Sequence, residues 1–104
     1  MKDFINIAVD AMGGENSPYK VIKGIKIHNN ISNNIFYNIF GNKKLIEPII
    51  NKLNISNSCY KIIHTDNAIK DTDSPLAAAK KGKDTSMWLS IENLKNKESD
   101  AIVS

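Results

Sequence analysis

Apolar positions along this 104-residue chain fall into two kinds of run, one continuous and one with helical spacing. The continuous runs are rich in Ile and Val, which is typical of strands that are buried on both faces of a parallel sheet. They predict strands over residues 4–9, 35–40, 59–63 and 100–103. The runs with helical spacing lie between them, so strands and helices are expected to alternate.

The first helix is expected to begin at Pro18, because a proline in the first turn loses no backbone hydrogen bond. Asn16 or Ser17 can cap it, and the asparagine pairs within 29–34 are expected to end it. A second helix is predicted over 45–53. Pro48 lies inside it, which predicts a kink or a helix start at that residue.

After a loop over residues 67–73, a short helix is expected over 76–80, and a longer helix follows it. The spacing of the apolar residues in this longer helix indicates its inner side. The residues expected there are Met87, Trp88, Ile91 and Leu94.

The alternation predicts an α/β fold, a parallel, doubly wound sheet flanked by helices in three α/β/α layers. A fourth parallel strand normally leads through a loop into another covering helix, and here the sequence stops at that strand. Residues 1–104 are therefore expected to form the amino-terminal part of a single α/β domain, truncated after about four strands.

Composition narrows the class of protein. The hydrophobic share of 41% and the charged share of 24% are those of an ordinary globular protein. The net charge is +3, and the positive side chains are scattered lysines without interleaved aromatic residues, which argues against nucleic-acid binding. One cysteine, no metal-ligand spacing, no signal peptide and no apolar run of membrane-spanning length predict a cytoplasmic protein without a bound metal.

The most informative motif is Asp10 followed, after two residues, by Gly13 and Gly14 at the end of the first strand. Ligands of open α/β sheets bind at the carboxyl ends of strands. The segment lacks the G-x-G-x-x-G pattern of dinucleotide sites and the pattern of the P-loop. From the pattern alone, it is equally a ligand-binding loop or a simple connection.

A second candidate lies in residues 80–86, where Lys83 and Ser86 flank Asp84 at the start of a helix. Lysines and a helix amino terminus attract anions such as phosphate or phosphopantetheine. The simpler interpretation is a capped helix start with Asp84 or Thr85 as N-cap, and the residues alone favour it.

His64 and Cys59 are weaker candidates for chemistry. His64 follows the third strand without an identifiable partner, so a structural or partly solvated side chain is expected. Cys59 is expected to be a small buried hydrophobe rather than a nucleophile.

Taken together, these motifs resemble the amino-terminal portion of a PlsX-type phosphate acyltransferase of bacterial phospholipid synthesis. The matching segments are 7–18 (IAVDAMGGENSP), 41–42 with 46–48, 62–64, 74–87, and 100–104, which resembles the strand before the family's Ala-Gly-Asn-Thr-Gly loop. Glu15 stands where the family usually has Asp, and Gly82 replaces a usually basic residue. Members of the family are about three times this long.

The resemblance implies that inorganic phosphate attacks the thioester of fatty acyl-acyl carrier protein, giving acyl phosphate and free carrier protein, without cofactor or metal. It implies that Asp10, Gly13, Gly14 and Asn16 shape the first loop of the cleft. Lys83, Asp84 and Ser86 would handle phosphate or the pantetheine arm, and no catalytic residue is assigned.

The resemblance also implies a homodimer and peripheral membrane association for the full-length enzyme. This chain is expected to be a truncated or split form with little activity alone. The alternatives are a small α/β module that binds a phosphorylated ligand, and a gene remnant without function.

Overall fold

The computed structural model of the chain describes residues 4–14, 16–32, 34–66 and 85–103. The expected short helix over 76–80, the loop over 67–73, Lys83 and Asp84 lie outside the described residues.

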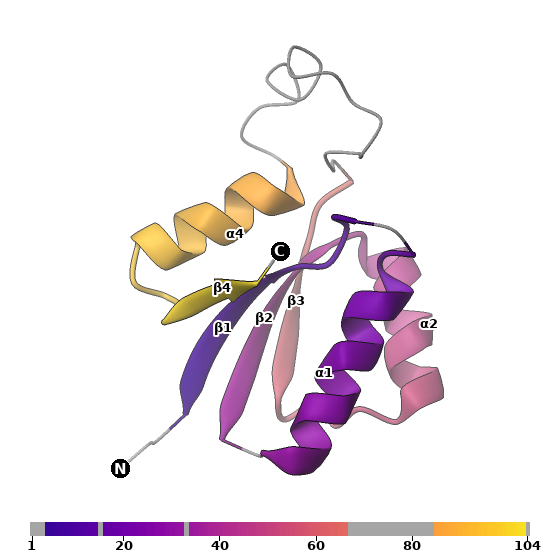
Figure 1. Cartoon of the computed structure of the whole chain (residues 1–104). Coiled ribbons are helices and arrows are strands. Elements are labelled where there is room, and N and C mark those ends of the chain that lie inside the picture. The colour runs from indigo at the N-terminus through magenta and orange to yellow at the C-terminus, as the bar shows by residue number, and fades with distance from the viewer. Residues whose placement is uncertain (1–3, 15, 33, 67–84, 104) are drawn as a thin grey trace.

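Four parallel strands form one sheet in the order β3-β2-β1-β4 (Figure 1). Their bounds are Ile5–Asp10 for β1, Ile35–Gly41 for β2, Tyr60–His64 for β3 and Ala101–Val103 for β4. β1 is therefore central, and in its register Ile7 lies opposite Tyr37 on one side and Ala101 on the other. The predicted parallel sheet is confirmed.

The described helices lie on both faces of the sheet (Figure 1). They are α1, Tyr19–Ile31, α2, Lys43–Leu53, and α4, Ser86–Lys95. α1 and α2 pack side by side on one face, and α4 crosses the other face over β1 and β2. Helices on both faces make the arrangement three-layered and doubly wound, as predicted.

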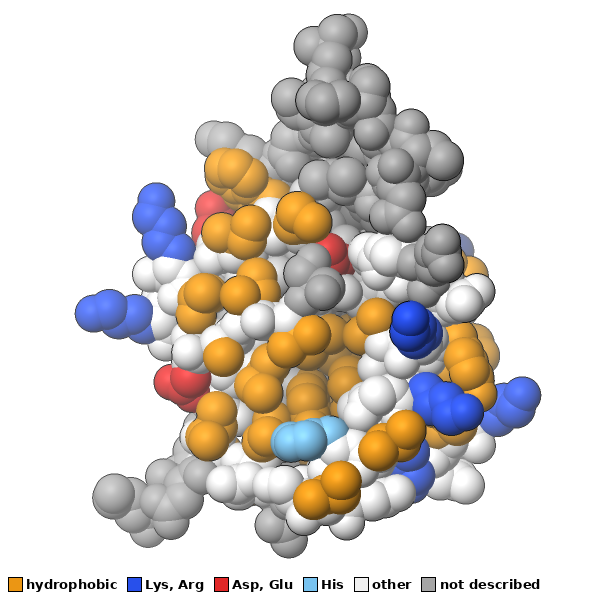
Figure 2. Space-filling model, in the orientation of Figure 1, with side chains coloured by type: hydrophobic (Ala, Val, Ile, Leu, Met, Phe, Trp, Pro, Cys, Tyr) orange, Lys and Arg blue, Asp and Glu red, His pale blue; other side chains and the backbone are white. Residues whose placement is uncertain are grey.

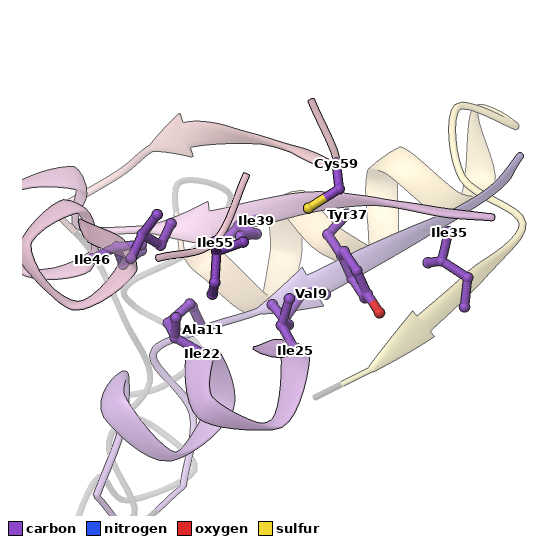
Figure 3. Close-up of a cluster of buried hydrophobic side chains, with 11 residues drawn as sticks. Val9, Ala11, Ile22, Ile25, Ile35, Tyr37, Ile39, Ile46, Ile55 and Cys59 are labelled. Carbon is purple, nitrogen blue, oxygen red and sulfur yellow. The ribbon is translucent and has the colours of Figure 1, made fainter. Parts of the chain in front are cut away.

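The main core lies between the sheet and the α1–α2 layer (Figure 3). Ile22 and Ile25 come from α1, and Ile46 and Ile50 from α2, at the spacing that brings one helical face onto a sheet. They contact the odd-numbered residues of the central strands, since alternate side chains of a strand point to the same face. These strand residues include Val9, Tyr37 and Ile39.

Two expectations about the helix starts are wrong: Pro48 does not begin the second helix, and neither Asn16 nor Ser17 caps the first with its side chain. α2 begins at Lys43, because the Asn42 side chain accepts a 3.0 Å hydrogen bond from the Lys44 amide and caps the helix before Pro48. α1 begins after Pro18 without a side-chain cap. The Ser17 hydroxyl instead donates to the carbonyl of Gly13 in the preceding loop.

The expected inner side of α4 is wrong for Trp88 and Ile91, whereas Met87 and Leu94 are half-buried. Trp88 and Ile91 are 41% and 48% exposed, whereas Ser86 and Ser90 are buried against the sheet. The sheet surface beneath the helix is mixed, because buried Asp10 and Asn38 lie beside buried Ala8 and Phe40, and the Asn38 amide donates to Ser99 Oγ at 2.8 Å. Ser86 donates its hydroxyl proton to Asp10, and Ser90 donates to the Ser86 carbonyl within the helix. Both hydroxyl groups are therefore satisfied although this side of α4 is buried, as buried polar groups require.

Candidate functional site

The loop that leaves β1 is anchored by Asp10, which is only 2% exposed. Its Oδ1 accepts a 3.1 Å hydrogen bond from the Met12 amide, which closes a tight turn directly after the strand. The Ala11 amide donates to the Phe40 carbonyl at 3.0 Å and extends the pairing of β1 with β2. The loop therefore starts from a fixed position at the carboxyl edge of the sheet.

Ser86, the first residue of α4, donates its hydroxyl proton to the same Oδ1 of Asp10 at 2.6 Å. The two residues are 76 positions apart in the sequence, and both are buried. A hydrogen bond to a carboxylate in such surroundings is short and comparatively strong. The structure thus joins the two candidate segments, and the Ser86 hydroxyl positions the β1 loop.

Gly13, Gly14 and Asn16 form the turn between β1 and α1, as the sequence predicts for a loop. Gly14 has φ of +86° and Asn16 has φ of 60°, in the left-handed region that Gly and Asn tolerate best. Asn16 accepts the Lys20 amide at its backbone carbonyl, at 3.0 Å, and so connects the turn to the first turn of α1.

A groove of about 550 Å³ opens beside this turn, between α1 and the strands β1 and β4. Asp10, Gly13 and Gly14 lie at its polar end, and most of its remaining wall is apolar. Figure 2 shows hydrophobic side chains gathered in the hollow of this face. His28 and Tyr37 also line the groove, and Tyr37 Oη lies 2.7 Å from His28 Nδ1.

His64 lies at the carboxyl end of β3 and has two partners that the sequence did not reveal. Its Nδ1 accepts the backbone amide of Lys43 at 3.0 Å, and its Nε2 lies 3.1 Å from Asp66 Oδ1. Because Nδ1 accepts, a neutral ring carries its proton on Nε2, toward the carboxylate. The side chain is part-exposed, as expected, and the His-x-Asp spacing after a strand was the available signal.

The start of α4 confirms the simpler interpretation of its sequence. Thr85 is the N-cap and accepts the Trp88 amide at 3.1 Å. The anion-handling role of Lys83 and Asp84 stays a prediction, since both lie outside the described residues.

Positive helix ends and carboxylates both lie at this sheet edge, where Asp10 contacts the first residue of α4 and Asp66 lies beside His64. α1, α2 and α4 all begin here, and none has an acidic residue in its first turn. Their positive dipole ends are therefore not offset by neighbouring carboxylates of the same helices. Lys43 and Lys44 begin α2 and add positive charge.

Cys59 precedes β3 and therefore lies near the opposite edge of the sheet from this site. Burial raises the pKa of its thiol, so the reactive thiolate is disfavoured at neutral pH. The prediction of a small buried residue is confirmed.

Within the described parts of the chain, no three His, Cys, Asp or Glu side chains come together as a metal site. Of the helices in those parts, none has the length and apolar character needed to span a bilayer.

The sequence profile of a family described as "Fatty acid synthesis protein" matches residues 5–104. The phosphate acyltransferase of Pelagibacter ubique is 53% identical over the whole chain, which covers 31% of that relative. The phosphate acyltransferase of Mycoplasmoides gallisepticum is 40% identical over 94% of the chain, and that of Bradyrhizobium diazoefficiens is 37% identical over 96%.

The chain covers 29% of each of these last two relatives. It thus spans about a third of the length of the curated relatives that it matches, and the match lies at their amino-terminal end. The profile covers nearly the entire chain, and the match to the Pelagibacter ubique relative spans both the β1 loop and the start of α4. The chain therefore belongs to the PlsX-type family of phosphate acyltransferases.

Proposed function

We propose that this chain supplies the amino-terminal part of an enzyme that transfers a fatty acyl group from acyl carrier protein to inorganic phosphate. The observation that carries the proposal is the Asp10–Ser86 hydrogen bond. It joins two segments of the family match at the carboxyl edge of the sheet, where α/β proteins bind ligands. Residues 1–104 would form part of one α/β domain, and the remaining part would complete the cleft.

The chemistry needs positioning and charge stabilisation more than a protein nucleophile. A phosphate oxygen attacks the thioester carbonyl, a tetrahedral anion forms, and the thiolate of the carrier's pantetheine arm leaves and takes up a proton. Backbone amides of the Gly13–Gly14 turn and the positive start of α4 suit the binding of such anions. Lys83 and Asp84 would extend the same site, and Asn16 would help to hold the turn.

Asp10 and Ser86 are assigned as positioning residues. Both direct their polar atoms toward each other inside the protein, so their effect on turnover would act through the β1 loop. The finer expectations, acyl carrier protein as donor and a homodimeric enzyme, belong to the same proposal and follow from the family.

The test is formation of acyl phosphate from acyl-acyl carrier protein and phosphate. The purified chain is assayed alone and with a polypeptide corresponding to the remaining part of the Pelagibacter ubique relative. We expect turnover only with both parts. Turnover by the chain alone would contradict a site shared with the remaining part.

Variants identify the part played by the β1 loop. Asp10→Asn should lower turnover by about 10-fold, as expected when a neutral amide oxygen replaces the charged acceptor of these hydrogen bonds. Asp100→Asn is the matched control, because Asp100 is exposed and accepts the Asn6 amide at the opposite edge of the sheet. Phosphate binding without turnover in any combination would favour a module that binds phosphorylated ligands. An unfolded chain would favour a gene remnant.

A further inference from the structure

Among the described residues, no element covers β4 on the face of the sheet that carries α1 and α2. Val103 lies opposite Val9 in the register and therefore points to this face, yet it is 52% exposed. Ala101, on the same face, is exposed as well. Parallel sheets are normally buried on both faces, so the structure lacks a covering element at this position within its described residues.

The side of α1 next to this strip has the character of a helix-packing surface. Val21, Gly24, Ile25 and His28 line the groove at intervals of three and four residues, which place them on one side of the helix. A Cβ added at Gly24 would meet nothing within 4 Å. The glycine leaves open space in the middle of the stripe, where a neighbouring backbone can approach closely.

We propose that this groove binds an apolar helix. The helix belongs to the part of a phosphate acyltransferase that this chain does not match. Roughly two thirds of the length of each of these relatives lies outside the match, and the occupant would come from that part. The inference rests on this length and on the groove, and it does not depend on the reaction.

The dimensions of the layer support a helix as the occupant. α2 and α1 already pack side by side on this face, and a helix spacing of 8–10 Å covers about two strands at about 4.8 Å each. A third helix beside α1 would continue the layer over β4. The groove runs from Ser17 to His28, about 17 Å or three helical turns.

The handedness of the crossovers indicates where the occupant comes from. The connection from β3 to β4 carries α4 on the opposite face, and a right-handed connection onward to a strand beyond β4 would place the next helix there too. The helix in the groove therefore comes from a later part of the sequence, not from the segment directly after β4.

The test uses Gly24→Trp, which fills the groove from the α1 side. Ile27→Trp is the matched control on the same helix, because Ile27 is 54% exposed and does not line this groove. The probe is the polypeptide corresponding to the remaining part of the Pelagibacter ubique relative, added separately and also fused after residue 104. The readouts are the dissociation constant and the midpoint of thermal unfolding, so turnover is not needed.

We expect Gly24→Trp to leave the unfolding midpoint of the isolated chain unchanged or higher, since the site is open and glycine disfavours a helix. The same change should weaken binding of the added polypeptide by at least about 10-fold and lower the midpoint of the fused protein by several degrees. Ile27→Trp should do neither.

Three results would overturn the proposal. The first is a fused protein whose midpoint is insensitive to Gly24→Trp. The second is a dimer of the chain, seen by sedimentation, that this change dissociates, because the occupant would then be a second copy. The third is binding of a fluorescent fatty acid that Gly24→Trp blocks while the affinity for the polypeptide is unchanged.

Discussion

Replacing Ser86 by Ala removes the 2.6 Å hydrogen bond that joins α4 to the β1 loop. Ser86 is 1% exposed and Asp10 is 2% exposed, so water has little access to replace the lost donor. A hydrogen bond to a charged group contributes about 1.5–3 kcal/mol. The Met12 amide still donates to Asp10 in the variant, which places the expected loss near the lower end, at about 1.5–2 kcal/mol.

The assay is urea unfolding followed by circular dichroism, with the free energy of unfolding taken by linear extrapolation. For a domain of this size the loss corresponds to a fall of roughly 6–15 °C in the thermal midpoint. Ser58→Ala is the control, since that residue is exposed and its hydroxyl lies 2.8 Å from the Ser56 hydroxyl in the same turn.

A double-mutant cycle separates this bond from other effects of truncation. The coupling free energy between Asp10→Ala and Ser86→Ala should be about 1 kcal/mol or more, because the two residues contact each other directly. Additivity of the two changes within about 0.3 kcal/mol would refute the reasoning.

Three further predictions concern the backbone, alkaline pH and the surface of α4. Gly14→Ala should destabilise the chain by about 1–2 kcal/mol because of the positive φ, whereas Gly24→Ala in the middle of α1 should stabilise it by up to about 1 kcal/mol; urea unfolding of the pair measures both. Burial raises the pKa values of Cys59 and Tyr37 above their ordinary 9.0 and 10.0, so the folded chain keeps protons that the unfolded chain releases. The stabilising contribution of these two groups should therefore be complete below about pH 9 and be lost as the pH rises further. Tyr37→Phe should reduce the fall above about pH 10, the ordinary pKa of tyrosine; an equal fall in the variant would contradict the assignment. Trp88→Gln should change the free energy of unfolding by less than about 0.5 kcal/mol, since the ring is 41% exposed. A loss of about 3 kcal/mol or more would show that the Trp88 ring belongs to the core.

The fold was predictable because its signals are local and agree with one another. Continuous apolar runs mark β1 and β2, and helical spacing marks α1 and α2. The hydrogen-bond partners of buried polar side chains were harder to predict from the sequence. Nothing near Ser86 in the sequence indicates that its hydroxyl reaches Asp10, because the contact depends on α4 crossing the sheet.

Similarly, apolar spacing alone placed Trp88 inside, whereas the buried side of the helix carries Ser86 and Ser90, and the Asp10 side chain that Ser86 contacts lies 76 positions earlier. The Asp10-x-x-Gly13-Gly14 motif indicated a loop at the right edge. The sequence did not indicate which of its atoms bond within the protein and which can face a ligand. That distinction comes from the three-dimensional contacts.

The polar underside of α4 restricts how this helix can move. Apolar surfaces slide over each other at little cost, whereas hydrogen bonds lose their energy within a fraction of an ångström and with modest changes of angle. The contacts at Asp10 and around Asn38 hold the two ends of the helix, through Ser86 and Asn93. A ligand that moved the first turn of α4 along the helix axis would therefore strain the contact at Asp10 and the contact at Asn38 together.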